Sequence, residues 1–463
     1  MELNTISSVK KRIKESSAKP IIEEILKKIE KSKINGFVTI NKNAINRAEE
    51  IDNDRDCKDL KLKGVPIAIK DNISTKGIET TCSSQILKGY VPPYDAHIIE
   101  KLINAGAIII GKTNMDEFAM GNSTETSYFG TTLNPHDHTC VPGGSSGGSA
   151  AVVSAKEVPV SIGSDTGGSV RCPASFCGVV GFKPTYGMVS RYGLISYANS
   201  LEQIGPIAET VEDIAILMDV IGGYDEKDST SINKTIQYEE SLKEDFVGLK
   251  IGIPKEYFAE GIDEGVEKLI WKSIQKYENM DCSWEEVSLP HTKHALASYY
   301  IIAMSEASSN LARFDGTRFG MREEGNTWGS MAANTRAKGF GKEVKCRVML
   351  GTYALSAGYY SKYYLKAMKV RTLVKNDFER AFSKVDVLMT PTMPKTAFKI
   401  GEIQDPISSY MMDVNTVPIN LAGVPSISIP CGLLNKLPVG LQIIGKHFDE
   451  TKILQTANAF EVN

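Results

Sequence analysis

A chain of 463 residues is long enough for one large α/β enzyme or for two or three average domains. Apolar residues make up 42% of it and charged residues 24%, which is ordinary for a soluble globular protein. The formal net charge of −3 argues against strong direct binding of nucleic acid. No apolar run reaches the length of about 18 residues that spans a bilayer, so we expect no transmembrane helix and no membrane partner.

The sequence carries eight cysteines, and their spacing indicates neither a disulfide framework nor a metal site. No two of them form a C-x-x-C pair, and Cys172 with Cys177 lacks the second cluster that a zinc site needs. The N-terminal stretch MELNTISSVKKRIKE is charged and has no apolar core, which argues against a secretory signal peptide. Scattered thiols in such a chain are typical of a reducing compartment, so we expect a cytoplasmic protein.

Residues 1–56 are predicted to be helical and peripheral. Pro20 stands where the first turn of a helix tolerates proline, and apolar side chains follow it at helical spacing. We interpret this stripe as core packing rather than as a face for a partner. It consists of Ile21, Ile22, Ile25, Leu26 and Ile29.

Residues 61–200 alternate apolar strands with helices, which favours an α/β architecture. Residues 65–69 have the pattern of a buried strand that ends at Lys70. We expect a helix over 98–104 and a buried strand over 107–110.

Residues 201–463 continue this alternation. The polar stretch 225–235 is interpreted as an exposed, solvated excursion. Because strands near both ends would serve one sheet, we expect a single domain over 1–463. Within it, 1–60 is an N-terminal helical segment, 61–200 the core, and 201–463 the remainder of the sheet with further helices. We expect helices over 211–222, 265–280 and most of 290–383, and strands over 248–254, 283–289, 385–394, 425–431 and 440–445.

Residues 143–171 contain two glycine-serine loops, GGSSGGS at 143–149 and DTGGS at 165–169. Paired glycines let a ligand approach the backbone closely and let several N–H groups converge on one oxyanion or phosphate. Neither loop has the lysine of a P-loop after its last glycine, and the dinucleotide pattern G-x-G-x-x-G is absent. Phosphate binding is therefore the weaker interpretation.

Lys70 is a candidate base for the serines of these loops. A buried lysine is costly while charged, so it can lose its proton near neutral pH and act as a general base. The alternative is a structural lysine paired with Asp71 or another acid. No histidine lies in these motifs, which disfavours a Ser-His-Asp triad.

With these motifs, the chain from Leu60 onward resembles the amidase signature family. The stretches that carry the resemblance are KGVPIAIKDNI, GKTNMDEFAMGNSTETSYFG, VPGGSSGGSAA, GSDTGGSVR and GFKPTYGMVSRYGLI. Three more, EASSNLARFDGTRFG, VMLGTYALSAGYY and NLAGVPSISIPCG, are similar to one branch of the family, the A subunits of tRNA-dependent glutamine amidotransferases. The resemblance implies an α/β fold with a large mixed β-sheet flanked by helices on both faces.

The resemblance also implies a Ser–cis-Ser–Lys triad. In it Ser169 is the nucleophile, Ser145 relays protons, and Lys70 is the base. The peptide bond between Gly144 and Ser145 would be cis, and Ser146 is the local rival of Ser145. The oxyanion hole would consist of the backbone N–H groups of Thr166, Gly167, Gly168 and Ser169.

By the same resemblance the substrate is glutamine, hydrolysed to glutamate and ammonia through a glutamyl ester. Arg347 would bind the α-carboxylate and Asp413 the α-ammonium. Tyr299 would line the same pocket, although the neighbouring Tyr300 leaves the register open. Without the resemblance, these positions suit a surface arginine, a helix-capping acid and a core tyrosine equally well.

Asp165 and Arg171 flank the second glycine loop, and we interpret them as structural charges that brace it. The resemblance implies a heterotrimer with B and C subunits, in which the B subunit uses the ammonia to amidate glutamyl- or aspartyl-tRNA. The tRNA would be contacted mainly through the B subunit. No metal or cofactor is expected in this chain, while ATP and Mg²⁺ are expected in the B subunit.

Two other functions remain open from the sequence. A free-standing amidase would share Lys70, Ser145 and Ser169 but would need neither Arg347 nor Asp413. A binding protein with a glycine-rich anion site would need no reactive serine.

Overall fold

The computed structural model describes residues 3–53, 60–244, 246, 248–258 and 261–463. Residues 1–2 and 54–56 of the predicted helical segment, and Cys57, therefore lie outside the described residues. Among the described residues, no helix combines the length and the apolarity that crossing a bilayer requires.

In the described residues, the first half of the chain supplies six strands and six α-helices. In order they are α1 (Ile6–Ser16), α2 (Lys19–Glu30), β1 (Phe37–Ile40), α3 (Ala44–Asn53), β2 (Pro66–Lys70), α4 (His97–Asn104), β3 (Ile108–Thr113), α5 (Gly147–Ser154), β4 (Val160–Asp165), α6 (Arg171–Cys177), β5 (Val180–Lys183) and β6 (Gln203–Ala208).

The second half adds five strands and longer helices. In order they are α7 (Val211–Ile221), α8 (Tyr238–Ser241), β7 (Lys250–Pro254), α9 (Glu264–Glu278), β8 (Ser283–Val287), α10 (Ala295–Asn310), α11 (Trp328–Gly339), α12 (Lys342–Leu355), α13 (Tyr364–Phe382), β9 (Val387–Pro391), α14 (Pro406–Met411), α15 (Val417–Ala422), β10 (Ser426–Leu434), β11 (Leu437–Ile444) and α16 (Glu450–Val462).

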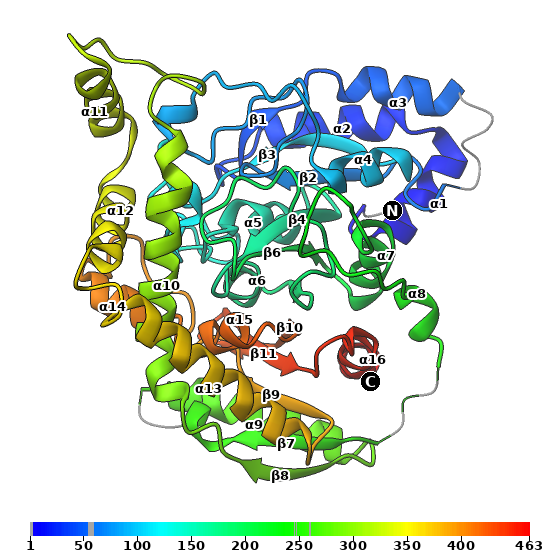
Figure 1. Ribbon diagram of the computed structural model, residues 1–463. Coiled ribbons are helices and arrows are strands. Elements are labelled where there is room, and N and C mark those ends of the chain that lie inside the picture. Colours follow the sequence, from blue (N-terminus) through cyan, green and yellow to red (C-terminus); the bar gives the residue numbers. More distant parts are fainter. Residues whose placement is uncertain (1–2, 54–59, 245, 247, 259–260) are drawn as a thin grey trace.

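The eleven strands of the described residues form one mixed sheet in the order β1-β3-β2-β4-β6-β5-β10-β11-β9-β7-β8. Helices from both halves of the chain surround it (Figure 1). Side chains of β2 enter two different cores, because Ile67 and Ile69 join one apolar cluster and Ala68 joins another. The centre of the sheet is thus buried on both faces, and the predicted α/β architecture is confirmed.

The predicted helices and strands of residues 65–110 and 211–445 are present with small shifts at their ends. The stripe on α2 packs into the core as expected, since Ile21, Ile22 and Ile25 are buried. Three strands, β1, β5 and β6, were not predicted. The glycine and proline in β6 suggest a loop, but a Cβ on Gly205 would lie 2.1 Å from the carbonyl oxygen of Phe182 on β5. Glycine is needed there because the two backbones approach so closely.

The interpretation of residues 225–235 as a wholly solvated excursion is wrong at two positions. Asp225 and Asp228 are buried. Asp225 accepts a hydrogen bond of 2.5 Å from the Ser190 hydroxyl, and Asp228 accepts one of 2.9 Å from the backbone N–H of Arg191. These aspartates hold residues 225–235 against the stretch GFKPTYGMVSRYGLI, which contains Ser190 and Arg191.

The sheet brings the candidate base and the second glycine loop to one edge. Strands β2 and β4 are parallel neighbours, with Ile69 opposite Ile162. The carboxyl ends of adjacent parallel strands lie at the same edge of a sheet, which is where ligands bind in many α/β folds. Lys70 ends β2 and Asp165 ends β4, so the loop that leads to Ser169 begins beside Lys70.

We predict that Ile162→Ala in β4 lowers the free energy of unfolding by about 2–5 kcal/mol, because it leaves a cavity in a fully buried strand. Denaturant unfolding measures the change. The control is Leu433→Ala, whose side chain is 62% exposed and whose loss should cost no more than about 0.5 kcal/mol. Equal losses in the two variants would contradict the central position of β4.

Candidate active site

Lys70 is completely buried at the end of β2. Its Nζ donates hydrogen bonds of 2.8 Å to Ser145 Oγ and 3.2 Å to the carbonyl oxygen of Ser164. Burial lowers the pKa of Lys70 to about 7, although the carboxylates of Asp116 and Asp165 oppose this shift. A substantial fraction of Lys70 is therefore neutral at physiological pH and able to accept a proton.

The alternative of a structural ion pair between Lys70 and Asp71 does not fit the geometry. Within the described residues, Lys70 forms no salt bridge. The Asp71 carboxylate instead accepts hydrogen bonds of 3.1 Å and 3.0 Å from the backbone N–H groups of Thr81 and Ser83. Asp71 thus fixes the turn that follows β2, and Lys70 is free to hydrogen-bond to Ser145.

The two serines of the first loop have different surroundings. The hydroxyl of Ser146 donates to the carbonyl oxygen of Ser164 at 3.1 Å and accepts from the Ser164 N–H at 3.3 Å, so Ser146 is occupied in holding the loop to β4. Ser145 faces Lys70, and its peptide bond to Gly144 is cis, as the resemblance implies. A backbone hydrogen bond of 3.1 Å from Ser146 N–H to Ser169 carbonyl joins the two glycine loops.

The second loop carries Ser169 at the surface of the site. Ser169 is 7% exposed, whereas Lys70 and Ser145 are 0% exposed. The two residues before it, Gly167 and Gly168, must be glycine because neighbouring side chains leave no room for a Cβ. A Cβ on Gly167 would lie 2.5 Å from the Tyr299 hydroxyl oxygen, and one on Gly168 would lie 2.4 Å from Thr416 Oγ1. Segments distant in sequence therefore clamp the loop on both sides.

One of the four expected oxyanion donors is occupied. The N–H of Gly168 donates a hydrogen bond of 2.8 Å to Asp165 Oδ1. In this structure the Gly168 amide therefore braces the loop, because an amide engaged by a carboxylate is not free for an oxyanion. In the described part of the chain, the N–H groups of Thr166, Gly167 and Ser169 donate to no acceptor.

Asp165 and Arg171 form a buried ion pair, 3.0 Å between Oδ2 and Nε, as the bracing interpretation requires. Arg171 also reaches the C-terminal half of the chain, donating to Gln442 at 2.7 Å and to Asn420 at 2.6 Å. Burial alone would raise the pKa of Asp165, but the guanidinium of Arg171 and the hydrogen bonds hold that pKa well below its usual range. Asp165 thus remains a carboxylate and fixes the loop.

Arg347, Tyr300 and Asp413 lie together beside this loop. Tyr300 donates a hydrogen bond of 2.6 Å to Asp413, and the guanidinium of Arg347 lies 5.3 Å from the centre of the Tyr300 ring. Arg347 is 4% exposed and donates to Glu343 at 2.7 Å and to the Tyr197 hydroxyl at 2.9 Å. The result is a polar pocket in which Arg347 is paired with Glu343 and the Asp413 carboxylate lies nearby.

The two tandem tyrosines do different things. Tyr299 lies against Gly167 of the nucleophile loop, while Tyr300 bonds to Asp413. Their rings meet edge to face, with centroids 5.0 Å apart. Burial raises the pKa of Asp413 to about 6, against the opposing hydrogen bonds from Tyr300 and Asn122.

A cavity of about 450 Å³ opens next to Arg347. Its wall includes residues 120–123, which follow the GKTNMDEF motif, and the start of α12. A cavity with a few convergent polar groups is the usual form of a small-molecule site. In the described residues, no group of three or more His, Cys, Asp or Glu side chains is placed to hold a metal ion.

The family model described as amidase matches residues 20–454 of this chain. The chain belongs to the amidase family. It is 66% identical over 460 residues to the A subunit of glutamyl-tRNA(Gln) amidotransferase from Methanococcoides burtonii, and the match covers 99% of this chain and 96% of that protein.

Among solved amidases, the crystal structure of the glutamyl-tRNA(Gln) amidotransferase A subunit from Thermotoga maritima is similar, with a TM-score of 0.85 and 44% identity over 99% of this chain and 94% of that one. The peptide amidase PAM, solved with the inhibitor chymostatin, has a TM-score of 0.86 and 27% identity over 99% and 97% of the two chains.

Several residues of this amidase site had no role assigned from sequence. Asp116 accepts a hydrogen bond of 2.9 Å from the Thr124 N–H and would touch any Cβ on Gly144, so it packs under the serine loop. Asn122 donates to Asp413 at 3.1 Å. Both lie in the quoted stretch GKTNMDEFAMGN, which was the signal that they matter. Tyr197 and Glu343, the partners of Arg347, offered no comparable signal.

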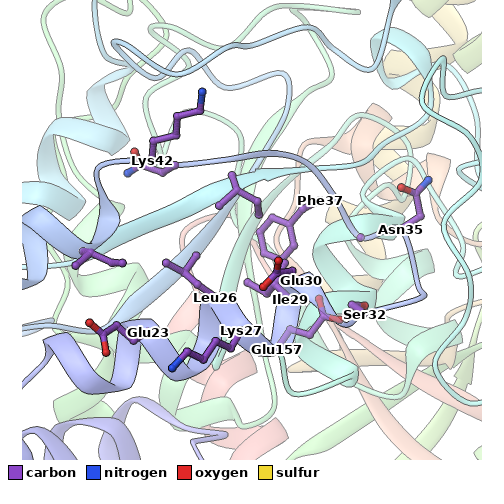
Figure 2. A pocket seen from close by; sticks show the side chains of 14 residues that line it. Glu23, Leu26, Lys27, Ile29, Glu30, Ser32, Asn35, Phe37, Lys42 and Glu157 are labelled. Atoms are coloured by element: carbon purple, nitrogen blue, oxygen red, sulfur yellow. The ribbon is translucent and has the colours of Figure 1, made fainter.

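A larger cavity of about 810 Å³ lies elsewhere, between α2 and the edge strand β1. Leu26, Ile29 and Phe37 line it, with Glu157 and Ser32 to one side (Figure 2). Burial raises the pKa of Glu157 to about 7. None of the candidate catalytic or substrate-binding residues lines this cavity, so its size does not make it the active site.

We predict that Arg171→Met costs about 3–5 kcal/mol of stability, because it leaves the buried Asp165 carboxylate unpaired. Denaturant unfolding again measures the change. Lys268→Met is the matched control, because Lys268 forms an exposed ion pair with Glu264 whose loss should cost less than about 1 kcal/mol. A loss of stability in Arg171→Met no larger than in the control would show that the buried pair does not brace the loop.

Proposed function

We propose that this chain is the glutamine-hydrolysing subunit of a tRNA-dependent amidotransferase, a carbon–nitrogen ligase with glutamine as amido donor. The observation that carries the proposal is the 2.8 Å hydrogen bond from buried Lys70 to Ser145, beside the loop that presents Ser169. The adjoining pocket, with Arg347 and Asp413, supports glutamine as the substrate. The names of the similar proteins, A subunits of glutamyl-tRNA(Gln) amidotransferase, support the same conclusion.

In the first step the Ser169 oxygen attacks the side-chain amide carbon of glutamine. Its proton passes to Ser145 Oγ, which in turn gives its own proton to neutral Lys70. This relay suits a weak serine nucleophile, which needs an adjacent base. The oxyanion of the tetrahedral intermediate accepts hydrogen bonds from the N–H groups of Thr166, Gly167 and Ser169. Loss of one such donor typically costs about 10²–10³ in rate.

In the second step the carbon–nitrogen bond breaks and the leaving nitrogen takes a proton back through Ser145. Ammonia departs, and a glutamyl ester remains on Ser169. Water then attacks the ester while the same relay removes its proton, which releases glutamate and restores the hydroxyl. Because Lys70 ends each half-reaction neutral, the cycle needs no other base.

Glutamine carries an α-carboxylate and an α-ammonium, and the pocket offers a partner for each. The guanidinium of Arg347 suits a carboxylate, since a planar fork binds two oxygens. Asp413 suits the ammonium, and Tyr300 orients it through their 2.6 Å hydrogen bond. Tyr299 supports the nucleophile loop from the same helix. A free-standing amidase would have no need of this pair of opposite charges.

The ammonia requires an acceptor, which we assign to a partner subunit. B and C subunits complete the complex, and the B subunit binds ATP, Mg²⁺ and most of the tRNA. The product is Gln-tRNA, Asn-tRNA or both. The seven cysteines in the described residues are all unpaired, which supports a reducing cytoplasm as the working place.

We predict that Ser169→Ala abolishes glutamate release from glutamine, with a loss on the order of 10⁴–10⁶ in kcat, because Ser169 supplies the oxygen that attacks the amide. The assay uses the complex purified through this chain under native conditions. Ser175→Ala is the control, since this buried serine on α6 lies outside the relay and its loss should change the rate less than about twofold.

Retention of glutamate release in Ser169→Ala would contradict the proposed nucleophile. If the unaltered chain hydrolyses other amides but not glutamine, and brings down no partner subunits, it is a free-standing amidase. If Ser169→Ala changes nothing and a serine-directed electrophile fails to label the chain, the glycine loops form a binding site only.

The lowered pKa of Lys70 predicts the pH dependence of the reaction. The neutral amine is the base, so kcat/KM for glutamine should be high above pH 7 and fall about tenfold per pH unit below an apparent pKa of about 7. Below a pH of about 6, protonation of Asp413 should add a rise in KM. A pH profile of the complex tests this, and a flat kcat/KM across neutral pH would exclude Lys70 as the base.

A further inference from the structure

Helix α12 presents apolar side chains on both of its faces. The inner face packs tightly against α10, because a Cβ on Gly351 would lie 1.9 Å from the carbonyl oxygen of Met304. The outer face carries Cys346, Met349, Leu350 and Tyr353, at the spacing i, i+3, i+4, i+7 of one helical stripe. Their exposed fractions, 73%, 47% and 48% for the last three, are large.

The outer stripe continues into the turn that leads to α13. The ring of Tyr359 lies 4.5 Å from that of Tyr353, and the ring of Tyr363 lies 5.9 Å from both. Tyr359 is 37% exposed and Tyr363 38% exposed. Together these side chains form one surface at the margin of the molecule, where Figure 1 shows α12 on the outside of α10. We call this surface the α12 patch, and it consists of Cys346, Met349, Leu350, Tyr353, Tyr359 and Tyr363.

The segment that carries the α12 patch is rich in lysine, and Lys362 Nζ lies 5.8 Å from the centre of the Tyr359 ring. All lysines of residues 342–369 are exposed, and in the described structure none of them forms a salt bridge. The only acidic residue of that segment is Glu343, which pairs with Arg347 toward the pocket. The whole chain, by contrast, has a net charge of −3. The lysines in question are Lys342, Lys345, Lys362, Lys366 and Lys369.

We propose that the α12 patch is the docking surface for the partner subunit that consumes the ammonia, and that this subunit meets it with an apolar face bordered by aspartate and glutamate. The proposal rests on the proposed function. Aromatic residues and methionine are enriched at the centres of protein interfaces, and complementary charge at the rim guides association. Because α12 also supplies Arg347 and Lys342 to the cavity wall, a subunit docked here lies beside the glutamine pocket.

Two other occupants fit the surface less well. A second copy of this chain would bring the same lysines against each other in a two-fold contact, which like charges disfavour. RNA would suit the lysines, since phosphate contacts dominate its binding. It would not explain the apolar stripe of Met349 and Leu350, which offers nothing to a phosphate backbone.

The test measures binding rather than catalysis, so it uses Ser169→Ala as the parent chain. Its affinity for the separately purified partner subunits of the same organism is determined by titration, with and without added Met349→Ser and Tyr353→Ser. We expect this double variant to weaken binding by about tenfold or more, since central aromatic side chains carry most interface energy. Leu433→Ser is the matched control, with a 62% exposed leucine on β10 and an expected change below twofold.

Charge reversal provides a second, independent readout. Lys345→Glu with Lys362→Glu should weaken binding and reduce its dependence on salt, because the rim attraction is electrostatic. Thermal unfolding of each variant shows that the chain is folded. If all variants bind the partner subunits as the parent does, the α12 patch is not the interface, although the proposed function stands. If the parent chain binds no partner subunit, both proposals fail.

The RNA alternative has its own outcome. The parent chain is titrated with unfractionated tRNA in the absence of other subunits. Binding of tRNA that Lys345→Glu with Lys362→Glu removes, combined with unchanged partner affinity in Met349→Ser with Tyr353→Ser, would assign the surface to RNA and overturn the proposal.

Discussion

This site depends on the burial of one lysine, Lys70. A charged ammonium is costly to bury, and Lys70 forms no salt bridge in the described structure, so burial lowers its pKa to about 7. In its neutral form, Lys70 Nζ can then accept a proton from the Ser145 hydroxyl to which it is hydrogen-bonded. A sheet buried on both faces is what makes this possible, since a strand open to solvent would leave the lysine charged.

The same edge of the sheet also holds a permanent charge pair. Asp165 and Arg171 are as deeply buried as Lys70, but they neutralise each other and fix the loop between them. Arg171 extends this support to Asn420, which belongs to the far half of the chain. The loop that presents Ser169 is therefore held both by its own ion pair and by residues from the second half of the chain.

Helix α12 connects this site to the molecular surface. Arg347 on its inner side faces the pocket, while Met349 and Tyr353 on its outer side face solvent. A helix that is apolar on both sides is stable in water only at the cost of exposed hydrophobic area, which is typical of an interface. Because Arg347 and the exposed stripe both belong to α12, the helical repeat places Arg347 beside the pocket and the stripe on the solvent side.

Sequence by itself determined the long periodic elements, the α/β class, and the strand that ends at Lys70, because these depend on local apolar patterns. It also drew attention to both glycine loops. It left β1, β5 and β6 unpredicted, since their short or glycine-containing runs become strands only beside their neighbours in the sheet. The family resemblance already favoured Ser145 over Ser146. Only the tertiary structure decided that Tyr300 rather than Tyr299 bonds to Asp413 and that the Gly168 amide is engaged. Each of these choices rests on contacts between segments far apart in the chain, which no local pattern records.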